Sequence, residues 1–371
     1  MSRRKVVLAG GGTGGHVLPL LAIAEALVDL GVDPEGVQLL ASARGPDATL
    51  LDPTGFPVRY LPGRGLQRSL APRALLDNAR ATLALLRALG QTVSSFRTWR
   101  PQVVVSAGGY AAFAAVAAAV LGRVPLVVVN LDAVPGLVHR IFGRFAVASC
   151  VGFSGTGLPH EVVTGAPLPK GIEAVARDPE ARAAAKAELG VGPGPLVGIV
   201  GGSLGARSLN RAASELAPQL ANLGCELLHV AGSRDFPALH QALEEGSQPP
   251  GYHLVEFERR MALLYTAADL VVARAGAMTV AELAQTRVPS ILVPLPGAPG
   301  DHQTHNAEAL VRIGGAVVIR DGELTGDRLA AELRRLLPPA EGLEEMAHAL
   351  EQLPRTHAAR AIAEEVLRHG G

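Results

Sequence analysis

Cysteine, aromatic residues and net charge are all scarce in this chain. Two cysteines, Cys150 and Cys225, are too few for a disulfide framework and are not spaced as metal ligands. They indicate two ordinary thiols in a reducing compartment. The 34 basic and 34 acidic residues cancel, so no global field favours nucleic acid as a partner. Any site for an anion must therefore be local.

Aromatic residues make up 4% of the chain, although hydrophobic residues make up 48%. The core must therefore be built mainly from Ala, Val and Leu, which suits helices packed on buried parallel strands. The longest apolar stretch, Tyr110–Leu121, is far short of the roughly 20 residues that span a bilayer. The basic residues Arg3–Lys5 are similar to the start of a signal peptide, but the glycine-rich run Gly10–Gly15 interrupts the apolar segment that such a peptide needs. We expect no membrane-spanning segment.

Short apolar segments alternate with helical ones along the first part of the chain. Strands are expected at Lys5–Ala9, Val37–Ala41, Val103–Ser106 and Leu126–Val129, with a helix at about Val17–Leu30. Such alternation predicts an α/β fold with a doubly wound parallel sheet.

The same pattern restarts after Ala166–Pro169, which is predicted to be a linker. A helix at Pro179–Leu189 ends at Gly190. Further strands are expected at Leu196–Val200, Glu226–Val230, Leu270–Val272 and Ser290–Val293.

We therefore predict two domains, which the chain length allows. The first comprises residues 1–165, joined by a C-terminal helix within residues 350–371. The second comprises residues 166–349. The C-terminal helix, at about His357–Leu367, follows a break at Pro354.

Three glycine turns each follow an apolar strand and precede a helix: Gly10–His16, Ser106–Tyr110 and Gly201–Ala206. Glycine lets backbone N–H groups approach an anion, and the helix N-terminus behind adds unpaired donors and a positive dipole end. One such turn is weak evidence, because glycines also simply make tight turns. Three in corresponding places predict phosphate groups at the carboxyl ends of the strands, in a cleft between domains.

The first turn also contains the spacing G-x-G-x-x-G, at Gly10, Gly12 and Gly15, which raises the alternative of a nicotinamide-dependent dehydrogenase. That class uses an acidic residue at the end of the second strand to hold a ribose. Here the second strand ends in Leu40–Ala43, without an acid. The dinucleotide interpretation is therefore disfavoured.

Five motifs together resemble the MurG family of glycosyltransferases. They are Gly11–Val17, Gly108–Tyr110, Gly201–Ala206, Arg274–Glu282 and Asp301–Ala307, in the family's order over nearly the whole chain. The resemblance implies a GT-B fold, with two Rossmann-like doubly wound parallel-sheet domains facing a cleft. It implies inverting transfer of N-acetylglucosamine from UDP-N-acetylglucosamine to the 4-hydroxyl of a muramyl-pentapeptide. That acceptor is carried on undecaprenyl diphosphate, and its product serves peptidoglycan synthesis.

The resemblance implies a UDP-sugar site in the second domain. Its residues would be Gly202, Ser203, Phe257, Ala277, Met278, Thr279, Glu282 and Gln303. Ser203 and the amides near Gly202 would meet the diphosphate, the backbone at Phe257 the uracil, and Gln303 the sugar. Residues 277–279 would lie under the donor at a helix start. Glu282 would bind the ribose, because one carboxylate can accept hydrogen bonds from two adjacent hydroxyls; a solvated helix carboxylate is its alternative role.

The glycine loops of the first domain are implied to hold the acceptor diphosphate, through Thr13, Gly14, Gly15, Gly108, Gly109 and Tyr110. His16 closes the first loop and is the leading candidate for the general base. The attacking hydroxyl must lose a proton, and the pKa of histidine starts at about 6.5. Binding of the acceptor phosphate and capping of the helix are its alternative roles. Asp132 is the next candidate base.

Three departures from the family's pattern affect fine contacts. Val129–Asp132 stands where the family has His-Glu-x-Asn, and Leu204 stands where glutamine is usual. Ala166–Pro169 stands in place of Asn-Pro-Val-Arg, so an arginine expected near the diphosphate is missing, with Lys170 beside the gap.

A basic segment between residues 60 and 100 has Asp77 as its only acid. Its arginines are Arg64, Arg68, Arg73, Arg80, Arg87, Arg97 and Arg100, and leucines 75, 76, 83, 86 and 89 roughly fit helical spacing. This pattern predicts an amphipathic surface that docks on anionic lipid. A core-facing helix with a solvated arginine face is the alternative. Docking implies a peripheral protein on the cytoplasmic face of a bacterial membrane.

The sequence requires no cofactor. It contains no D-x-D pair of aspartates, so it gives no signal for a metal site and leaves the response to divalent metal open. Rival functions on the same fold are a UDP-N-acetylglucosamine 2-epimerase and another lipid-acceptor glycosyltransferase. A rival of another class is a non-catalytic nucleotide-sugar binding protein, which has no need of a base at His16. Cell-wall synthesis proteins are further candidate partners.

Overall fold

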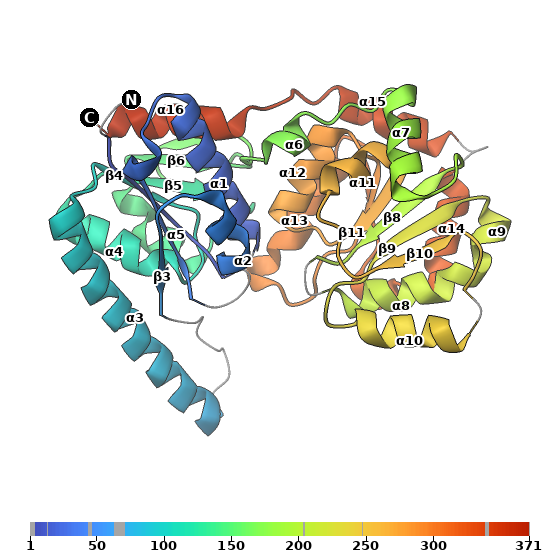
Figure 1. Ribbon diagram of the computed structural model, residues 1–371, viewed down its shortest axis with the longest axis horizontal. Coiled ribbons are helices and arrows are strands. Elements are labelled where there is room, and N and C mark those ends of the chain that lie inside the picture. Colours follow the sequence, from blue (N-terminus) through green and yellow to red (C-terminus); the bar gives the residue numbers. More distant parts are fainter. Residues whose placement is uncertain are drawn as a thin grey trace. The chain divides into compact units, whose positions relative to one another are not determined.

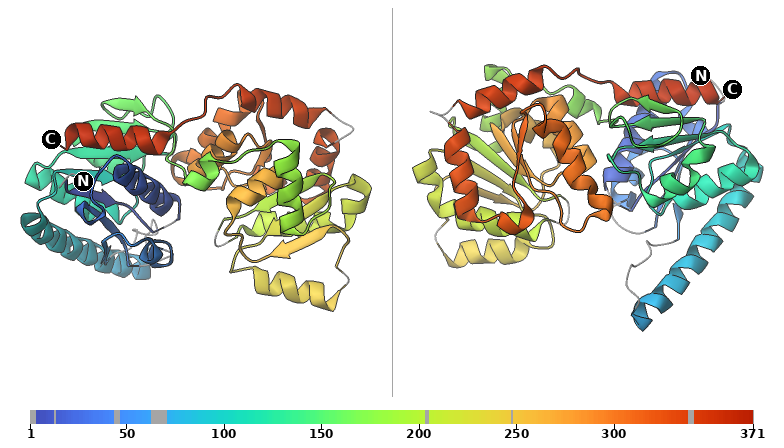
Figure 2. Two further views of the ribbon diagram at one scale, coloured as in Figure 1. Left: turned by 45° about the horizontal axis from the view of Figure 1, so that its top comes forward. Right: turned by 180° about the vertical axis from the view of Figure 1, so that it is seen from behind.

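A computed structural model describes residues 4–12, 14–43, 47–62, 71–202, 205–246, 248–337 and 341–370. The chain divides into two compact units (Figures 1 and 2). The first consists of Met1–Pro169 with Thr356–Gly371, and the second of Lys170–Arg355. The predicted acceptor and donor roles of the two domains remain predictions.

The first unit contains a seven-stranded parallel sheet in the order β3-β2-β1-β4-β5-β6-β7. Its strands are β1 Val6–Ala9, β2 Val37–Ser42, β3 Val58–Leu61, β4 Val103–Ser106, β5 Leu126–Asn130, β6 Ala148–Val151 and β7 Glu161–Val163. In the central register, Leu8 of β1 lies between Leu39 and Val105. Strands β1, β4 and β5 are buried throughout, which explains why they consist of Val, Leu and Ala apart from Ser106 and Asn130 at the ends of β4 and β5.

The helices of the first unit are α1 Gly14–Asp29, α2 Asp47–Leu51, α3 Pro72–Trp99, α4 Ala112–Gly122, α5 Leu137–Phe142 and α16 Ala358–His369, with short 3-10 turns η1 Pro34–Gly36, η2 Asp52–Thr54 and η3 Gly143–Phe145. The C-terminal α16 packs along α1 and β4 (Figure 1). Arg4 secures it by donating a hydrogen bond from Nη1 to the carbonyl of Leu367 at 2.7 Å.

Helix α3 is the longest in the first unit among the described residues. Its C-terminal half packs on α4 and on the core through Ala88 and Phe96. Its N-terminal end extends away from the sheet of its own unit (Figure 1).

The second unit contains a six-stranded parallel sheet in the order β10-β9-β8-β11-β12-β13. Its strands are β8 Leu196–Val200, β9 Glu226–Val230, β10 Tyr252–Val255, β11 Leu270–Ala273, β12 Ser290–Leu292 and β13 Ala316–Val318. Its helices are α6 Lys170–Glu173, α7 Pro179–Leu189, α8 Arg207–Leu216, α9 Leu220–Leu223, α10 Phe236–Glu245, α11 Met261–Ala267, α12 Ala277–Thr286, α13 His302–Val311, α14 Gly326–Leu336 and α15 Gly342–Glu351, with 3-10 turns η4 Ala217–Gln219, η5 Pro299–Asp301 and η6 Asp321–Glu323.

The predicted doubly wound fold is confirmed in both units. Each sheet grows from its first strand to one side and then reverses, so that β1 lies between β2 and β4, and β8 between β9 and β11. Ligands of such sheets bind at the carboxyl ends of the strands where the order reverses. The three predicted glycine turns follow β1, β4 and β8 at these positions. Within the described ranges, no helix combines the length and the apolar character needed to cross a membrane.

Candidate functional site

The two glycine turns of the first unit lie side by side because β1 and β4 are parallel neighbours. The amide of Ala107 donates to the carbonyl of Ala9 at 2.9 Å, which continues the ladder into the turns. Gly109 has a φ of +74°, and a Cβ added there would lie 2.7 Å from the carbonyl oxygen of Gly11 and 3.0 Å from Cδ2 of His16. Only glycine fits this approach. The fold therefore brings His16 against the second glycine turn.

A buried carboxylate, which the sequence analysis missed, holds the first turn. Asp47 accepts hydrogen bonds from the amides of Gly12 at 3.0 Å and Ser42 at 2.8 Å. Burial raises the pKa of Asp47, while these hydrogen bonds and the nearby His16 act to lower it. The opposite side is held by Tyr110, whose hydroxyl lies 2.6 Å from that of Ser42 and whose ring a Cβ on Gly12 would strike.

A buried histidine, His139 of α5, holds the second turn. Its Nε2 lies 3.0 Å from the Ser106 hydroxyl and its Nδ1 3.2 Å from Oδ1 of Asn130. The Asn130 amide donates to the carbonyl of Asp132 at 2.7 Å, and the amide of Gly108 donates to the Ser106 hydroxyl at 3.3 Å. The chain of hydrogen bonds thus joins the backbone of Gly108 to that of Asp132.

The protonation of this chain follows from its donors and acceptors. Burial lowers the pKa of His139 to about 4, so the ring is neutral near pH 7. Since Oδ1 of Asn130 can only accept, Nδ1 of His139 carries the proton and Nε2 accepts from Ser106. The Ser106 oxygen is then free to accept from Gly108. His139 forms no sequence motif with its partners, and only the fold brings them together.

The structure gathers most of the predicted acceptor residues. Gly109 and Tyr110 of the second turn lie against Gly11, Gly12 and His16 of the first. Gly14 and Gly15 begin α1, three residues earlier than the predicted helix start. Thr13 lies outside the described residues. Asp132 follows β5, which β4 separates from β1.

The glycine turn of the second unit follows β8 and is held in a similar way. Gly205 has a φ of +76°, and a Cβ there would lie 2.0 Å from the carbonyl oxygen of Ala231. The side-chain amide of Asn210 donates to the same carbonyl at 3.0 Å. Buried His229 bridges Asn210 and Tyr252, at 2.9 and 2.7 Å. Burial lowers the pKa of His229 to about 4, so it too is neutral. Gly202 has a φ of +83°, whereas Ser203 and Leu204 lie outside the described residues.

Arg274, at the end of β11, fixes the turn before α12. Its guanidinium lies 2.6 Å from Asp321 and donates to the Ser208 hydroxyl at 2.8 Å and the Val293 carbonyl at 3.1 Å. Buried Asn306 donates to the carbonyl of Ala275 at 3.2 Å. These contacts tie together the segments that follow β11, β12 and β13 and the start of α8.

Helix α12 then starts at Ala277, with Gly276 as an N-cap that offers no side-chain partner. The first amides of a helix have no intrahelical acceptor. The amides of Ala277, Met278 and Thr279 therefore lack intrahelical acceptors, and their contact with a donor stays a prediction. In the described part of the chain, no three His, Cys, Asp or Glu side chains gather as metal ligands would.

Glu282 lies one turn into α12, where the Tyr265 hydroxyl donates to its Oε2 at 2.7 Å. Burial raises the pKa of Glu282 to about 7, and the hydrogen bond from Tyr265 acts to lower it. Tyr265 is itself buried and neutral, since burial and the nearby carboxylate raise its pKa. The Glu282 carboxylate, expected to accept hydrogen bonds from a ribose, thus titrates near neutral pH.

The structure also describes the surroundings of two further predicted donor residues, Gln303 and Phe257. Oε1 of Gln303 accepts from the amide of Leu295 at 2.9 Å, so this side chain holds the segment between β12 and α13. Phe257 follows β10 with its ring half exposed. The contacts of both residues with a donor stay predictions.

Comparison with known proteins assigns both units of the chain to one family. Residues 6–150 match the glycosyltransferase family 28 N-terminal domain, and residues 196–366 match the C-terminal domain. The UDP-N-acetylglucosamine–N-acetylmuramyl-(pentapeptide) pyrophosphoryl-undecaprenol N-acetylglucosamine transferase of Acidothermus cellulolyticus is 38% identical, covering 97% of this chain and 96% of its own.

Two further comparisons agree. The Desulforudis audaxviator protein of the same name is 35% identical, with 99% of each chain covered. The crystal structure of Acinetobacter baumannii MurG is 29% identical and has a TM-score of 0.73, covering 98% of this chain and 99% of that one. The chain therefore belongs to the MurG family of N-acetylglucosaminyl transferases.

Proposed function

We propose that the chain transfers N-acetylglucosamine from UDP-N-acetylglucosamine, with inversion, to the muramyl 4-hydroxyl of undecaprenyl-diphosphate-linked MurNAc-pentapeptide. This reaction converts lipid I to lipid II in peptidoglycan synthesis. The observation that carries the proposal is the identity of 35–38%, over nearly the full length, with relatives named for this transfer. The glycine turns after β1, β4 and β8, each held by hydrogen bonds with buried side chains, support it.

The second unit is proposed to bind the donor. The amides near Gly202, with Ser203, and the first amides of α12 would meet the diphosphate. Those of α12 lack intrahelical acceptors because they begin a helix. Glu282 would accept from the ribose hydroxyls, and the backbone at Phe257 would face the uracil. Gln303 would reach the sugar by leaving the amide of Leu295.

The first unit is proposed to bind the acceptor diphosphate at the turns after β1 and β4. His16 would take the proton from the 4-hydroxyl as that oxygen attacks the anomeric carbon from the face opposite UDP. The bond to UDP breaks in the same step, and the departing diphosphate is stabilised by the amides of the second unit. Asp47 and His139 would act as positioning residues, because each holds one glycine turn through hydrogen bonds.

The first unit is also proposed to rest on the cytoplasmic face of the membrane. Leu76, Leu83 and Leu86 of α3 are exposed, which supports lipid docking over the alternative of a core-facing helix. Among the predicted leucines whose side chains the structure describes, only Leu89 packs on the core. Arg80 and Arg87 lie exposed among them. Arg64 and Arg68 lie outside the described residues, as do the side chains of Arg73 and Leu75.

A second exposed group, on α5 and η3, supports the same proposal. Leu137, Ile141 and Phe145 are exposed next to Arg140 and Arg144. Helices α3 and α5 both pack on α4, and each carries exposed apolar side chains beside exposed arginines. Such a combination favours an anionic lipid surface.

Turnover of radiolabelled UDP-N-acetylglucosamine with a short-chain lipid-linked acceptor tests the function. The expected result is acceptor-dependent transfer of label into the lipid product. Interconversion of UDP-N-acetylglucosamine with its 2-epimer in the absence of acceptor would instead identify an epimerase. Tight binding of UDP without turnover of either kind would identify a non-catalytic binding protein.

A further inference from the structure

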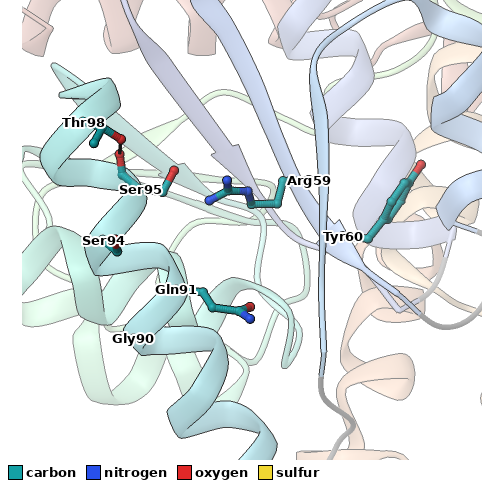
Figure 3. A pocket seen from close by; sticks show the side chains of 7 residues that line it. All are labelled: Arg59, Tyr60, Gly90, Gln91, Ser94, Ser95 and Thr98. Carbon is teal, nitrogen blue, oxygen red and sulfur yellow. Dashed lines mark hydrogen bonds between the residues drawn. The ribbon is translucent and has the colours of Figure 1, made fainter.

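A polar cavity of about 640 Å³ lies between the sheet-edge strand β3 and the C-terminal half of α3. It is lined by Arg59, Tyr60, Gly90, Gln91, Ser94, Ser95 and Thr98. Figure 3 shows the Arg59 guanidinium directed from β3 toward α3, while the Tyr60 side chain points to the other side of the strand. Cavities of roughly 300–1,000 Å³ are typical of small-molecule sites, so the space is sufficient for a ligand.

The lining offers unused hydrogen-bond donors and one positive charge. Within the described parts of the chain, the side chains of Arg59, Gln91, Ser94 and Ser95 have no hydrogen-bond or ion-pair partner. Thr98 donates to the carbonyl of Ser95 at 2.9 Å and retains its acceptor capacity. No acidic side chain is among the lining residues that the structure describes. An arginine with hydroxyl and amide donors around it suits a phosphate group.

The cavity continues the exposed face of α3. Residues 76, 80, 83, 87, 90 and 94 are spaced by alternating steps of four and three, so they lie along one side of the helix. The first four are Leu76, Arg80, Leu83 and Arg87, all exposed. The last two, Gly90 and Ser94, are small and open the helix surface toward Arg59. One helix face thus passes from an apolar and basic half to a phosphate-sized polar cavity.

We propose that the cavity between β3 and α3 binds the phosphate of an anionic phospholipid, with Arg59 and Ser94 as its principal contacts. The exposed leucines would contact the acyl chains while the phosphate enters the cavity, which explains why both features share one face. A free phosphate has no apolar group that could contact the leucines. The site is separate from the glycine turns that hold the acceptor diphosphate. The inference rests on the membrane docking in the proposed function.

Binding of dihexanoylphosphatidylglycerol, kept below its critical micelle concentration, tests the site by isothermal titration. We expect saturable binding that Arg59→Gln weakens by at least about tenfold, the effect of losing a hydrogen bond to a charged group. Ser94→Asp places a negative charge in the cavity that Arg59 also lines and should weaken binding as strongly. Arg97→Gln is the matched control, because it removes an exposed arginine of α3 that does not line the cavity; its affinity should stay within about twofold of the parent, since the charge it removes is solvated.

Equal affinities of Arg59→Gln and Arg97→Gln would overturn the proposal, because the lipid would then sense only overall charge. Inorganic phosphate or glycerol phosphate binding as tightly as the lipid would overturn it in favour of a free-phosphate site. Both variants lie on the surface, and thermal unfolding checks that they fold. The separate proposals are distinguished by parallel assays. Transfer to a short-chain acceptor reports on the enzyme activity, and vesicle binding of an Arg80→Glu, Arg87→Glu variant reports on docking.

Discussion

Glu282 titrates in the range where the enzyme would work. The ionised carboxylate accepts hydrogen bonds from both ribose hydroxyls, whereas the protonated form loses part of that capacity. Because burial raises its pKa to about 7, the ionised form dominates above that pH and declines below it. UDP affinity, measured by isothermal titration, should therefore fall as the pH drops through 7, up to about tenfold per pH unit.

Two variants make this prediction specific. Glu282→Gln should weaken UDP by about 1.5–3 kcal/mol and remove the pH dependence. Tyr265→Phe should shift the transition to higher pH. The hydrogen bond from Tyr265 lowers the pKa of Glu282, so removing it raises that pKa. Tyr252→Phe is the matched control, since Tyr252 is a buried phenol of the same unit that bonds His229 instead. An unshifted profile in Tyr265→Phe would contradict the assignment.

His16 is expected to act as the general base. At saturating acceptor, His16→Ala should lower turnover by about 100–10,000-fold, the usual contribution of a positioned base. A residue that only binds the acceptor would instead raise its Michaelis constant and leave turnover unchanged. Steady-state kinetics over a range of acceptor concentrations separate the two roles. Normal turnover at saturation would transfer the role of base to Asp132, and Asp132→Ala is the variant to compare.

Sequence reasoning found the glycines and His16 but missed the side chains that position them. Glycine runs and a following histidine are local signals. Asp47 bonds the amide of Gly12 across 35 residues, and His139 bonds Ser106 across 33. Asp47 and His139 lie in short helices with no motif of their own. Only the assembled fold of the first unit brings them to the turns.

At the scale of elements, one buried histidine in each unit helps to hold a glycine turn: His139 the turn after β4, and His229 the turn after β8. His139 links the ends of β4 and β5, and His229 links β9 to α8. His139→Ala should raise the Michaelis constant for the acceptor and leave UDP affinity unchanged, whereas His229→Ala should weaken UDP. Each should cost about 1–3 kcal/mol of stability, because its partners are left unsatisfied in the interior. Equal effects of both variants on both substrates would contradict this division.

The same histidines predict how stability depends on pH. Burial lowers both pKa values from 6.5 to about 4. Between these values the unfolded chain binds more protons than the folded one, so stability is lost as the pH falls from about 6.5 to 4. Denaturant unfolding at several pH values should show this loss, and it should be smaller in each His→Ala variant relative to its own value at neutral pH.

The strands that sequence reasoning found are those in which apolar residues predominate. Strands β4, β8 and β9 were predicted at their observed bounds. Strands β4 and β8 are almost wholly apolar, as a parallel strand covered on both faces requires, whereas β9 also contains Glu226 and His229. The edge strands β3 and β7 carry no such apolar run. Strand β3 has the sequence Val-Arg-Tyr-Leu with only Leu61 buried, and β7 is mostly exposed. Strand β6 is buried but contains Ser149 and Cys150, which weaken its β signal.

At the scale of the whole molecule, the repeated strand–turn–helix pattern predicted two doubly wound units because each pattern builds its own core. The net charge of zero means that attraction to a membrane must come from a local imbalance. Such an imbalance exists on α3, where Arg80 and Arg87 are exposed between Leu76, Leu83 and Leu86. The nearest acid in its sequence is Asp77.

Reversing Arg80 and Arg87 to Glu should therefore release the protein from vesicles that contain anionic lipid. Each basic residue near such a surface contributes about 1 kcal/mol, so losing both should lower the partition coefficient by at least about 30-fold. The matched control reverses Arg312 and Arg320, two exposed arginines of the second unit, which changes the net charge equally. Co-sedimentation at low salt is the measurement, since screening weakens the attraction at high salt. If the α3 variant still sediments like the control, the exposed face of α3 is not the docking surface, and the group on α5 and η3 becomes the surface to reverse.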